Sequence, residues 1–338
     1  EGFQKVFICF ETHDMQIHSI FGTIMKRSLI SLFCILMCLS AAARNRALLI
    51  GIGEYPESSG WEKISAANDM KLLSSTLKGY DITVLQDEKA TYAGIKNAFG
   101  QFTAKCTPGD TVIVHFSCHG QQMVQEKENI QEEQDRLDEA LVPFDAQRKL
   151  SSSYKGENHL RDDEFGLMID RLRERVSNKG LVIVLLDACH SDTAFRSAED
   201  EEKHIIIRGA RDIFGADDDS KYDPLKYKKP LVNIQESDYL SDVLYISACK
   251  AYQVNRETIQ NGIGYGSLTY SFCQVYTETC LQDLSALVTI VKKDMGKIAP
   301  AQNVGISASF ELQAEPKQTA TSVKKEESAL DRMLNRFK

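Results

Sequence analysis

Two apolar, β-branched stretches of the chain each end in the dipeptide Cys-His. The first reads TVIVHFSCHG over residues 111–120, and the second reads LVIVLLDACHSD over residues 181–192. Stretches this apolar on both faces are typical of strands buried inside a parallel sheet. Parallel strands end at a common edge of the sheet, and in open α/β sheets that edge carries the ligand site. The two Cys-His pairs therefore predict one site built from two strand ends.

Apolar runs of strand length alternate with helical patterns along most of the chain. Strands are expected at 46–53, 81–86, 109–117, 180–188, 242–249 and 304–312, and helices at 64–79, 90–104, 267–278 and 281–295. This alternation predicts an α/β fold with helices on both faces of the sheet. The polar, acidic stretch 121–139 is expected to be a long loop beside the site. The charged stretch 196–240 is expected to be a linker.

The first 43 residues are expected to be processing sequence. Residues 25–43, MKRSLISLFCILMCLSAAA, have the basic, apolar and small-residue order of a secretory signal peptide. Their apolar run is short for a transmembrane helix. Residues 1–24 are expected to be an upstream extension, with Met25 as the true start. We therefore expect an exported protein, periplasmic or secreted, with no firm membrane association.

Charge and cysteine content narrow the classes of function. The net charge is −8 and the chain has no long basic run, which argues against nucleic acid as a partner. No CxxC motif supports a zinc ribbon or a thioredoxin-type centre. Six cysteines after residue 43 are too few for a disulfide scaffold, so at least one is expected to be a working thiol. We expect a monomer.

Strand parity suggests which residues of the two dipeptides work together. Alternate side chains of a strand point to opposite faces, so Ser117 and His119 share one side. Asp187 and Cys189 share a side in the same way. Parity equally permits the converse pair of Cys118 with His190, so it narrows the choice without deciding it.

A nucleophilic cysteine needs a neighbouring base to populate its thiolate, and histidine is the usual one. The predicted site is therefore a thiol-imidazole pair, with the remaining Cys and His as supporting residues. Gly120 follows the first dipeptide and lets a substrate carbonyl approach the backbone. The amides of Gly120 and Cys189 are the expected oxyanion hole.

A strand ending in Ser-x-His-Gly, followed about 70 residues later by one ending in Asp-x-Cys-His-Ser, resembles the caspase–metacaspase family of cysteine peptidases, and the metacaspase branch most closely. Five further segments resemble parts of that family: ALLIGIGEY, AANDM, DEALVPFDA, YISACKAYQVNRE and NGIGYGSLTYSF. The resemblance covers about residues 44–312. It implies a three-layer sandwich around a mostly parallel six-stranded sheet, with large-subunit-like 44–195, linker 196–240, small-subunit-like 241–312 and a tail at 313–338.

The resemblance implies a role for each matching residue. His119 would be the general base and Cys189 the nucleophile. Asp69, Ser117 and Asp187 match the metacaspase pocket for arginine or lysine at P1, the residue before the cleaved bond. Carboxylates there would favour a cationic side chain. The expected substrates are therefore proteins or peptides with a basic P1 residue.

Calcium and self-cleavage are further expectations. The dyad needs no cofactor for its chemistry, but many metacaspases need calcium, and Asp138 and the Asp162-Asp163 pair resemble part of such a site. Arg196 stands near the position of a further family aspartate, so the metal ligands are unknown. Self-cleavage within 196–240 would fit a basic specificity; the candidate positions are Lys203, Arg208, Arg211 and Lys229.

Two other classes of function stay open on sequence grounds. A catalytically silent caspase-like module would bind partners without cutting them. A metal-binding protein would use the four Cys and His side chains as zinc ligands, although parity places the members of each dipeptide on opposite sides. A cysteine phosphatase is disfavoured because Phe195 stands where its phosphate loop needs arginine.

Overall fold

The computed structural model describes residues 43–125, 137–188, 206–210, 212–219, 222, 234–250 and 253–313. The expected extension, nearly all of the expected signal peptide and the expected tail beyond residue 313 lie outside these residues and stay predictions. Among the described helices, none is long and apolar enough to cross a membrane.

Six strands form the central sheet, in the order β11-β8-β7-β3-β1-β2. Their bounds are β1 (Asn45–Gly51), β2 (Asp81–Gln86), β3 (Thr111–Ser117), β7 (Leu181–Asp187), β8 (Asp242–Ser247) and β11 (Gly305–Ala308). Neighbouring strands are parallel except for β11, which runs antiparallel to β8. The predicted mostly parallel six-stranded sheet is confirmed.

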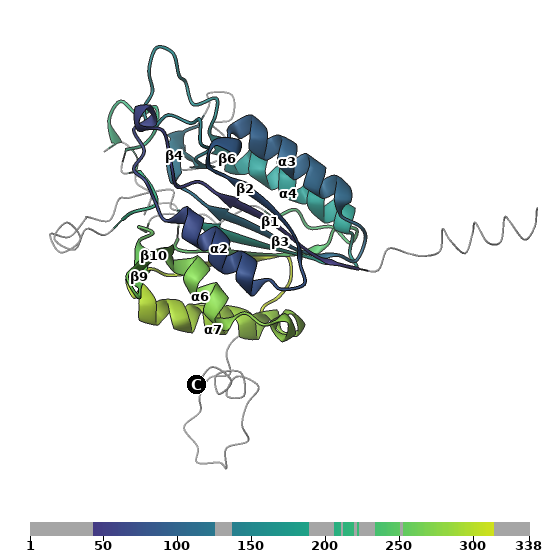
Figure 1. The fold of residues 1–338 in the computed structure, drawn as a ribbon. Helices are drawn as coiled ribbons and strands as arrows, with labels where there is room; N and C mark the ends of the chain where they lie inside the picture. The colour runs from purple at the N-terminus through teal and green to yellow at the C-terminus, as the bar shows by residue number, and fades with distance from the viewer. Residues whose placement is uncertain are drawn as a thin grey trace, which may run out of the picture. The chain divides into compact units, whose positions relative to one another are not determined.

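Helices cover both faces of this sheet (Figure 1). Their bounds are α2 (Ala66–Thr76), α3 (Tyr92–Lys105), α4 (Asp162–Val176), α6 (Ser267–Val275) and α7 (Leu284–Ile298), with 3₁₀ turns η1 (Glu57–Ser59), η2 (Asp87–Lys89) and η4 (Glu278–Gln282). Along β1, Leu48 and Ile50 join the core under α3 and α4, whereas Ala47 and Leu49 join the core under α2, α6 and α7. The strand thus alternates between two cores, as a three-layer sandwich requires.

Two smaller sheets lie beyond the carboxyl edge of the central one. β4 (Gly120–Val124), β5 (Leu137–Leu141) and β6 (Leu160–Arg161) pair antiparallel. β9 (Glu257–Gln260) and β10 (Ile263–Gly266) form a hairpin. Its turn residues Asn261 and Gly262 have φ of 52° and 79°, the left-handed values that a two-residue hairpin turn needs.

One expectation from the sequence is corrected, and two features were not foreseen. The loop expected at 121–139 is wrong at both ends, which are strands, because polar groups such as the Gln121 side chain are satisfied inside: its Nε2 donates to two backbone carbonyls. Helix α4 was not predicted; its apolar residues Phe165, Ile169 and Leu172 have helical spacing hidden among many charges. In the expected linker, Arg208 is fully buried.

Candidate active site

The site begins where β3 and β7 end. Their register pairs Ser117 with Asp187. The predicted catalytic residues, His119 and Cys189, each follow two positions later in the sequence. His119 is among the described residues. Cys189 and His190 lie outside them, so the choice of nucleophile stays a prediction. Cys118 packs in the core under α3 and α4, and burial raises the pKa of its thiol to about 12.

His119 is buried between two aromatic rings. The Trp61 ring stacks on it with centroids 4.9 Å apart, and the Tyr55 ring lies 5.1 Å away. His119 Nε2 lies 2.8 Å from the Glu62 carbonyl oxygen. A carbonyl can only accept, so Nε2 carries the hydrogen and donates it, which leaves a lone pair on Nδ1. Nδ1 is buried and has no hydrogen-bond partner among the described residues.

The protonation state of His119 suits a base. Burial lowers the pKa of His119 to about 4, which the hydrogen bond to Glu62 opposes and the positive charges of Arg208 and Arg148 reinforce. The imidazole is therefore neutral near pH 7. A neutral ring with an unshared Nδ1 lone pair can take a proton from a nearby acid.

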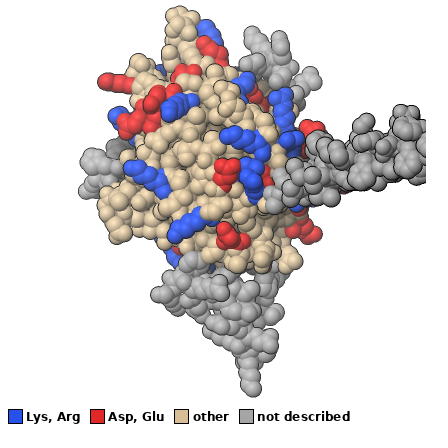
Figure 2. Space-filling view, turned by 45° about the vertical axis from the view of Figure 1, so that its right-hand side comes forward, with Lys and Arg blue, Asp and Glu red and all other residues tan. Residues whose placement is uncertain are grey.

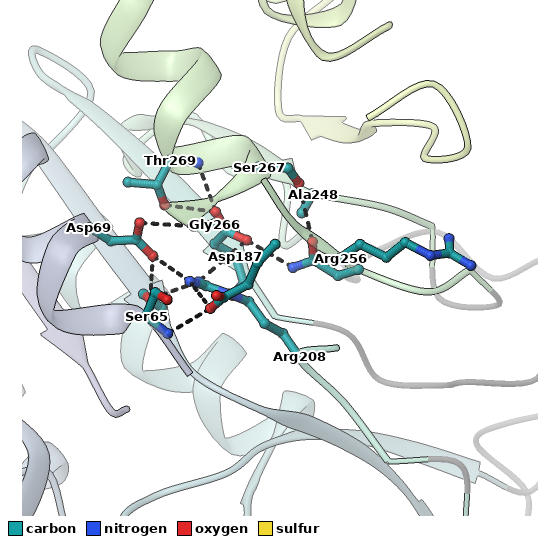
Figure 3. A network of polar contacts seen from close by, with 12 residues as sticks. Ser65, Asp69, Asp187, Arg208, Ala248, Arg256, Gly266, Ser267 and Thr269 are labelled. Carbon is teal, nitrogen blue, oxygen red and sulfur yellow. Dashed lines mark hydrogen bonds and ion pairs between the residues drawn. The ribbon is translucent and has the colours of Figure 1, made fainter. Parts of the chain in front are cut away.

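Asp69, Ser117 and Asp187 come together in one buried pocket. They are carried by α2, β3 and β7, and none of the three side chains is exposed. The Ser117 hydroxyl donates to Asp69 Oδ2 at 2.7 Å. Figure 3 shows the side chains of Asp69 and Asp187 gathered close to that of Arg208. The sequence-predicted pocket residues are thus adjacent in the fold.

The start of α6 holds both carboxylates in place. Thr269 donates to Asp187 Oδ2 from its backbone N–H and its hydroxyl, both at 2.7 Å, and Asn255 Nδ2 donates to Oδ1 at 2.8 Å. Gly266 N donates to Asp69 Oδ1 at 2.9 Å. The N-terminus of a helix favours negative charge nearby. A Cβ on Gly266 would overlap Asp187 Oδ2, so this wall of the pocket requires glycine.

The pocket contains the side chain of Arg208. Its Nη1 donates to Ser117 Oγ at 2.8 Å, and its Nη2 lies 2.8 Å from Asp69 Oδ2. Nη1 also lies 3.6 Å from Asp187 Oδ1 (Figure 3). Burial disfavours a charged guanidinium, but attraction to the carboxylates outweighs that cost and raises the pKa of Arg208 above its usual value.

Glu257 is a third pocket carboxylate that the sequence did not reveal. Its Oε1 accepts from Arg208 Nε at 3.2 Å and from Nη2 at 2.9 Å. The backbone N–H of Ser65 also donates to this oxygen, at 2.6 Å. The only signal in the sequence was that Glu257 ends the segment YISACKAYQVNRE, which resembles the small-subunit core of the family.

The pKa of Asp69 reflects the burial and the neighbouring charges of the pocket. Burial raises the pKa of Asp69 to about 6; Arg208 opposes this shift, and repulsion from Asp187 adds to it. Three carboxylates thus face one guanidinium in a space where none of the four side chains is more than 3% exposed. Such a pocket needs a cation, because buried carboxylates without one are costly.

Gly120 begins β4 directly after His119. It forms an isolated parallel bridge with Gly209, the residue that follows Arg208. The predicted oxyanion donor and the carbonyl end of Arg208 are therefore on adjacent backbone segments. Cys189, the other predicted donor, lies outside the described residues.

The described residues do not form a ready calcium site. Arg161 pairs with Asp138, so a cation already faces that carboxylate. Burial, together with Asp163 and Asp138, raises the pKa of Asp162 to about 7, which favours its protonated form. Among the residues that the structure describes, no group of three or more His, Cys, Asp or Glu could hold a metal ion. The expectation of calcium activation stays a prediction.

The comparisons decide the family. The family model described as "Caspase domain" matches residues 44–326. The chain belongs to the caspase domain family. The predicted resemblance to the caspase–metacaspase cysteine peptidases is confirmed.

Relatives within the family are distant. The chain is 25% identical over 273 residues to metacaspase-1B of Aspergillus fumigatus, which covers 69% of this chain and 62% of that protein. It is 24% identical over 274 residues to metacaspase-1 of Mycosarcoma maydis, covering 71% and 64%. The chain thus spans about three-fifths of the length of these relatives. A crystal structure of a Geobacter sulfurreducens protein matches with a TM-score of 0.51 at 19% identity, over 78% of this chain and 93% of that one, and supports the fold.

Proposed function

We propose that this chain is a cysteine endopeptidase that cleaves proteins or peptides after arginine or lysine. The observation that carries the proposal is the buried pocket in which Asp69, Asp187 and Glu257 surround a guanidinium group. The pocket lies beside His119 at the carboxyl edge of the sheet. A substrate arginine would meet the same charges and the same Ser117 hydroxyl as Arg208 does.

The chemistry is acyl transfer through a thioester. His119 Nδ1 takes the proton of the Cys189 thiol, and the sulfur attacks the carbonyl carbon of the P1 residue. The Gly120 and Cys189 amides stabilise the negative oxygen of the tetrahedral intermediate. His119 then gives its proton to the leaving amine as the C–N bond breaks. Water hydrolyses the thioester and restores the thiol.

Glu257 makes the pocket selective for arginine over lysine. Its Oε1 accepts from both Nε and Nη2 of Arg208, and only a guanidinium presents donors in that fork. A lysine amine can reach Asp69 or Asp187 at the base of the pocket but has no group at the Nε position. We therefore place lysine second among P1 residues.

Features outside the pocket are proposed from the sequence. We propose export through residues 25–43 and a monomeric enzyme without firm membrane association. We also propose activation by calcium, so each assay is run with and without calcium. Basic and acidic side chains are interspersed on the face shown in Figure 2. On that face there is no wide surface of a single charge.

A peptide-library cleavage profile tests the proposed function. The wild type should cut after arginine first and lysine second, and Cys189→Ala should cut nothing, each measured with and without calcium. Cleavage by Cys189→Ala, or a profile without basic P1 residues, would refute the assignment.

Covalent labelling separates an enzyme from a silent module. A peptide chloromethyl ketone with a P1 arginine should alkylate Cys189, whose sulfur displaces chloride to form a stable thioether that mass spectrometry detects in tryptic fragments. If neither the wild type nor Arg208→Gly, in which the pocket is empty, is labelled with or without calcium, a caspase-like binding module is favoured instead.

A further inference from the structure

His115 is a polar side chain in an apolar part of the central sheet. It lies on β3, and its register partners on the neighbouring strands are Leu49 and Leu185. Both leucines belong to the core under α2, α6 and α7, as does Ile113, which shares the face of β3 with His115. The His115 side chain is fully buried. Burial lowers the pKa of His115 to about 4, so the ring is neutral near pH 7.

The two ring nitrogens of His115 have different surroundings. Nδ1 is buried and has no hydrogen-bond partner among the described residues. An unpaired buried acceptor costs free energy, and a leucine at this position would avoid that cost. Nε2 lies 2.9 Å from the hydroxyl oxygen of Thr269 on α6. This single hydrogen bond is therefore what the imidazole provides and an apolar side chain could not.

The Thr269 hydroxyl connects His115 to the pocket. Thr269 lies in the first turn of α6, and its backbone N–H and hydroxyl both donate to Asp187 Oδ2 (Figure 3). A hydroxyl has a single hydrogen. Because that hydrogen goes to the carboxylate, Thr269 Oγ1 can only accept from His115, and Nε2 carries the ring hydrogen. With the opposite tautomer the hydroxyl would donate to Nε2, and Asp187 would lose one of its donors.

The second oxygen of Asp187 is held in a similar way. Asn255 Nδ2 donates to Asp187 Oδ1, and the side-chain carbonyl of Asn255 accepts from Gln302 Nε2 at 3.0 Å. The bond from Gln302 fixes which end of the Asn255 amide faces the carboxylate. Each oxygen of Asp187 therefore has a donor whose direction is set by a further buried side chain. Together the two arms fix the rotation of the carboxylate.

We propose that His115 is a positioning residue of the P1 pocket. By donating to Thr269, it keeps the Thr269 hydroxyl directed at Asp187, so that the carboxylate is held in the orientation that receives a cationic side chain. The proposal rests on the proposed function, because Asp187 must bind the P1 residue. A carboxylate already fixed in place loses less freedom on binding, so His115 contributes to substrate affinity and not to the chemical step.

The separation of KM from kcat tests this role. In His115→Leu, KM for an arginine peptide should rise about fivefold, the effect of one lost hydrogen bond, with kcat unchanged. His115→Gln, whose amide Nε2 can donate to the same oxygen, should restore KM. An unchanged KM in His115→Leu, or a loss confined to kcat, would overturn the proposal. If His115→Leu does not fold, His115→Asn replaces it, because that side chain ends short of the Nε2 position.

Leu49→Ala is the matched control for damage to the sheet. It leaves a cavity beside His115 and removes no polar contact, so it should lower the free energy of unfolding without changing KM. Urea unfolding and peptide kinetics are measured on the same preparation. If Leu49→Ala raises KM as much as His115→Leu does, loosening of the sheet explains both effects and the proposal fails.

A double-mutant cycle tests whether His115 acts through Thr269. Thr269→Val keeps the shape of the side chain but has no hydroxyl, so KM should rise at least about tenfold. Thr269→Ser retains the hydroxyl and should stay close to the wild type. Adding His115→Leu to Thr269→Val should cause no further rise, because the link is already broken. If the two effects multiply, His115 does not act through Thr269.

The direction of the relay is tested without catalysis. Nitrogen-15 labelling of the histidines in Cys189→Ala allows NMR to show which ring nitrogen of His115 carries hydrogen, with the signals assigned by their loss on adding His115→Gln. At pH 7 we expect hydrogen on Nε2, a bare Nδ1, and a shift of the Nε2 proton to lower frequency in Thr269→Val. An imidazolium, or hydrogen on Nδ1, would overturn the relay.

The outcomes separate this proposal from the proposed function. If the wild type cuts arginine peptides but His115→Leu has the same KM, the peptidase stands and the positioning role fails. If NMR shows hydrogen on Nε2 but the wild type cuts no peptide and is not labelled at Cys189, the proposed function fails. The relay is then a structural support of α6, and the positioning role fails with the function.

Discussion

Two buried arginines at opposite ends of the central sheet differ in the charge that faces them. Arg46, at the start of β1, pairs with the buried Asp110 at 2.7 Å and with the largely exposed Asp81 at 2.6 Å. Arg208, at the carboxyl edge, faces three carboxylates that are all buried. The first arrangement is close to charge balance inside the protein, and the second has an excess of negative charge.

The pKa values of the carboxyl groups shift in opposite directions in these two regions. Although burial opposes ionisation, hydrogen bonds from Arg44, Arg46 and Thr107 lower the pKa of Asp110. Burial and crowding instead raise the pKa of Asp69 to about 6. A balanced, fully hydrogen-bonded pair is typical of a structural ion pair, whereas buried carboxylates with raised pKa values are typical of functional sites. The two arginines therefore differ in the charge balance around them, and the proposed P1 pocket is the unbalanced one.

The largest expected effect is on catalysis by Asp187→Asn. Removing one carboxylate from a buried ion pair costs about 3 to 5 kcal/mol, so kcat/KM for an arginine peptide should fall by about 150-fold to about 5,000-fold. The assay compares the variant and the wild type at equal concentrations of folded protein. A loss below tenfold would show that this carboxylate does not bind P1.

The matched variant at the other arginine is Asp110→Asn. It should lower the free energy of unfolding by about 3 kcal/mol, because Arg46 then keeps only an exposed partner. Urea unfolding measures this change. Per folded molecule, kcat/KM should match the wild type; a specific loss of activity would break the distinction between the two regions.

A smaller effect is expected for Glu257→Gln. The variant keeps the size of the side chain but loses the charge opposite Nε and Nη2, an interaction worth about 1.5 kcal/mol. The ratio of kcat/KM for arginine over lysine peptides should fall about tenfold, mostly through the arginine value. An equal loss for both peptides would mean that Glu257 senses charge alone.

The mildest test is the pH dependence of substrate binding. As pH falls through about 6, Asp69 gains a proton and loses its negative charge, so KM for an arginine peptide should rise. The same titration in Asp69→Asn should lack this inflection. Because the pKa of His119 is lowered to about 4, its protonation should appear separately at lower pH, as a fall in kcat.

Much of the fold could be predicted because local patterns carry it. The apolar residues of β3 and β7 are buried on both faces, and runs of that kind have few other structures open to them. The family motifs also located Asp69, Ser117 and Asp187, which the structure places in one pocket. Helix α4 was not predicted because its apolar residues are separated by many charged ones, which makes the helical spacing difficult to recognise.

What the sequence determined by itself is the sheet, its layers and the strand ends at which polar side chains must gather, because alternation and burial along a strand are local properties. Only the tertiary structure decided which charges share the pocket. Arg208 belongs to a stretch that reads as a polar linker, and Glu257 is one acid among many. Their meeting at 2.9 Å depends on long-range packing, since a buried charge is stable only where its counter-charges have been assembled from distant segments.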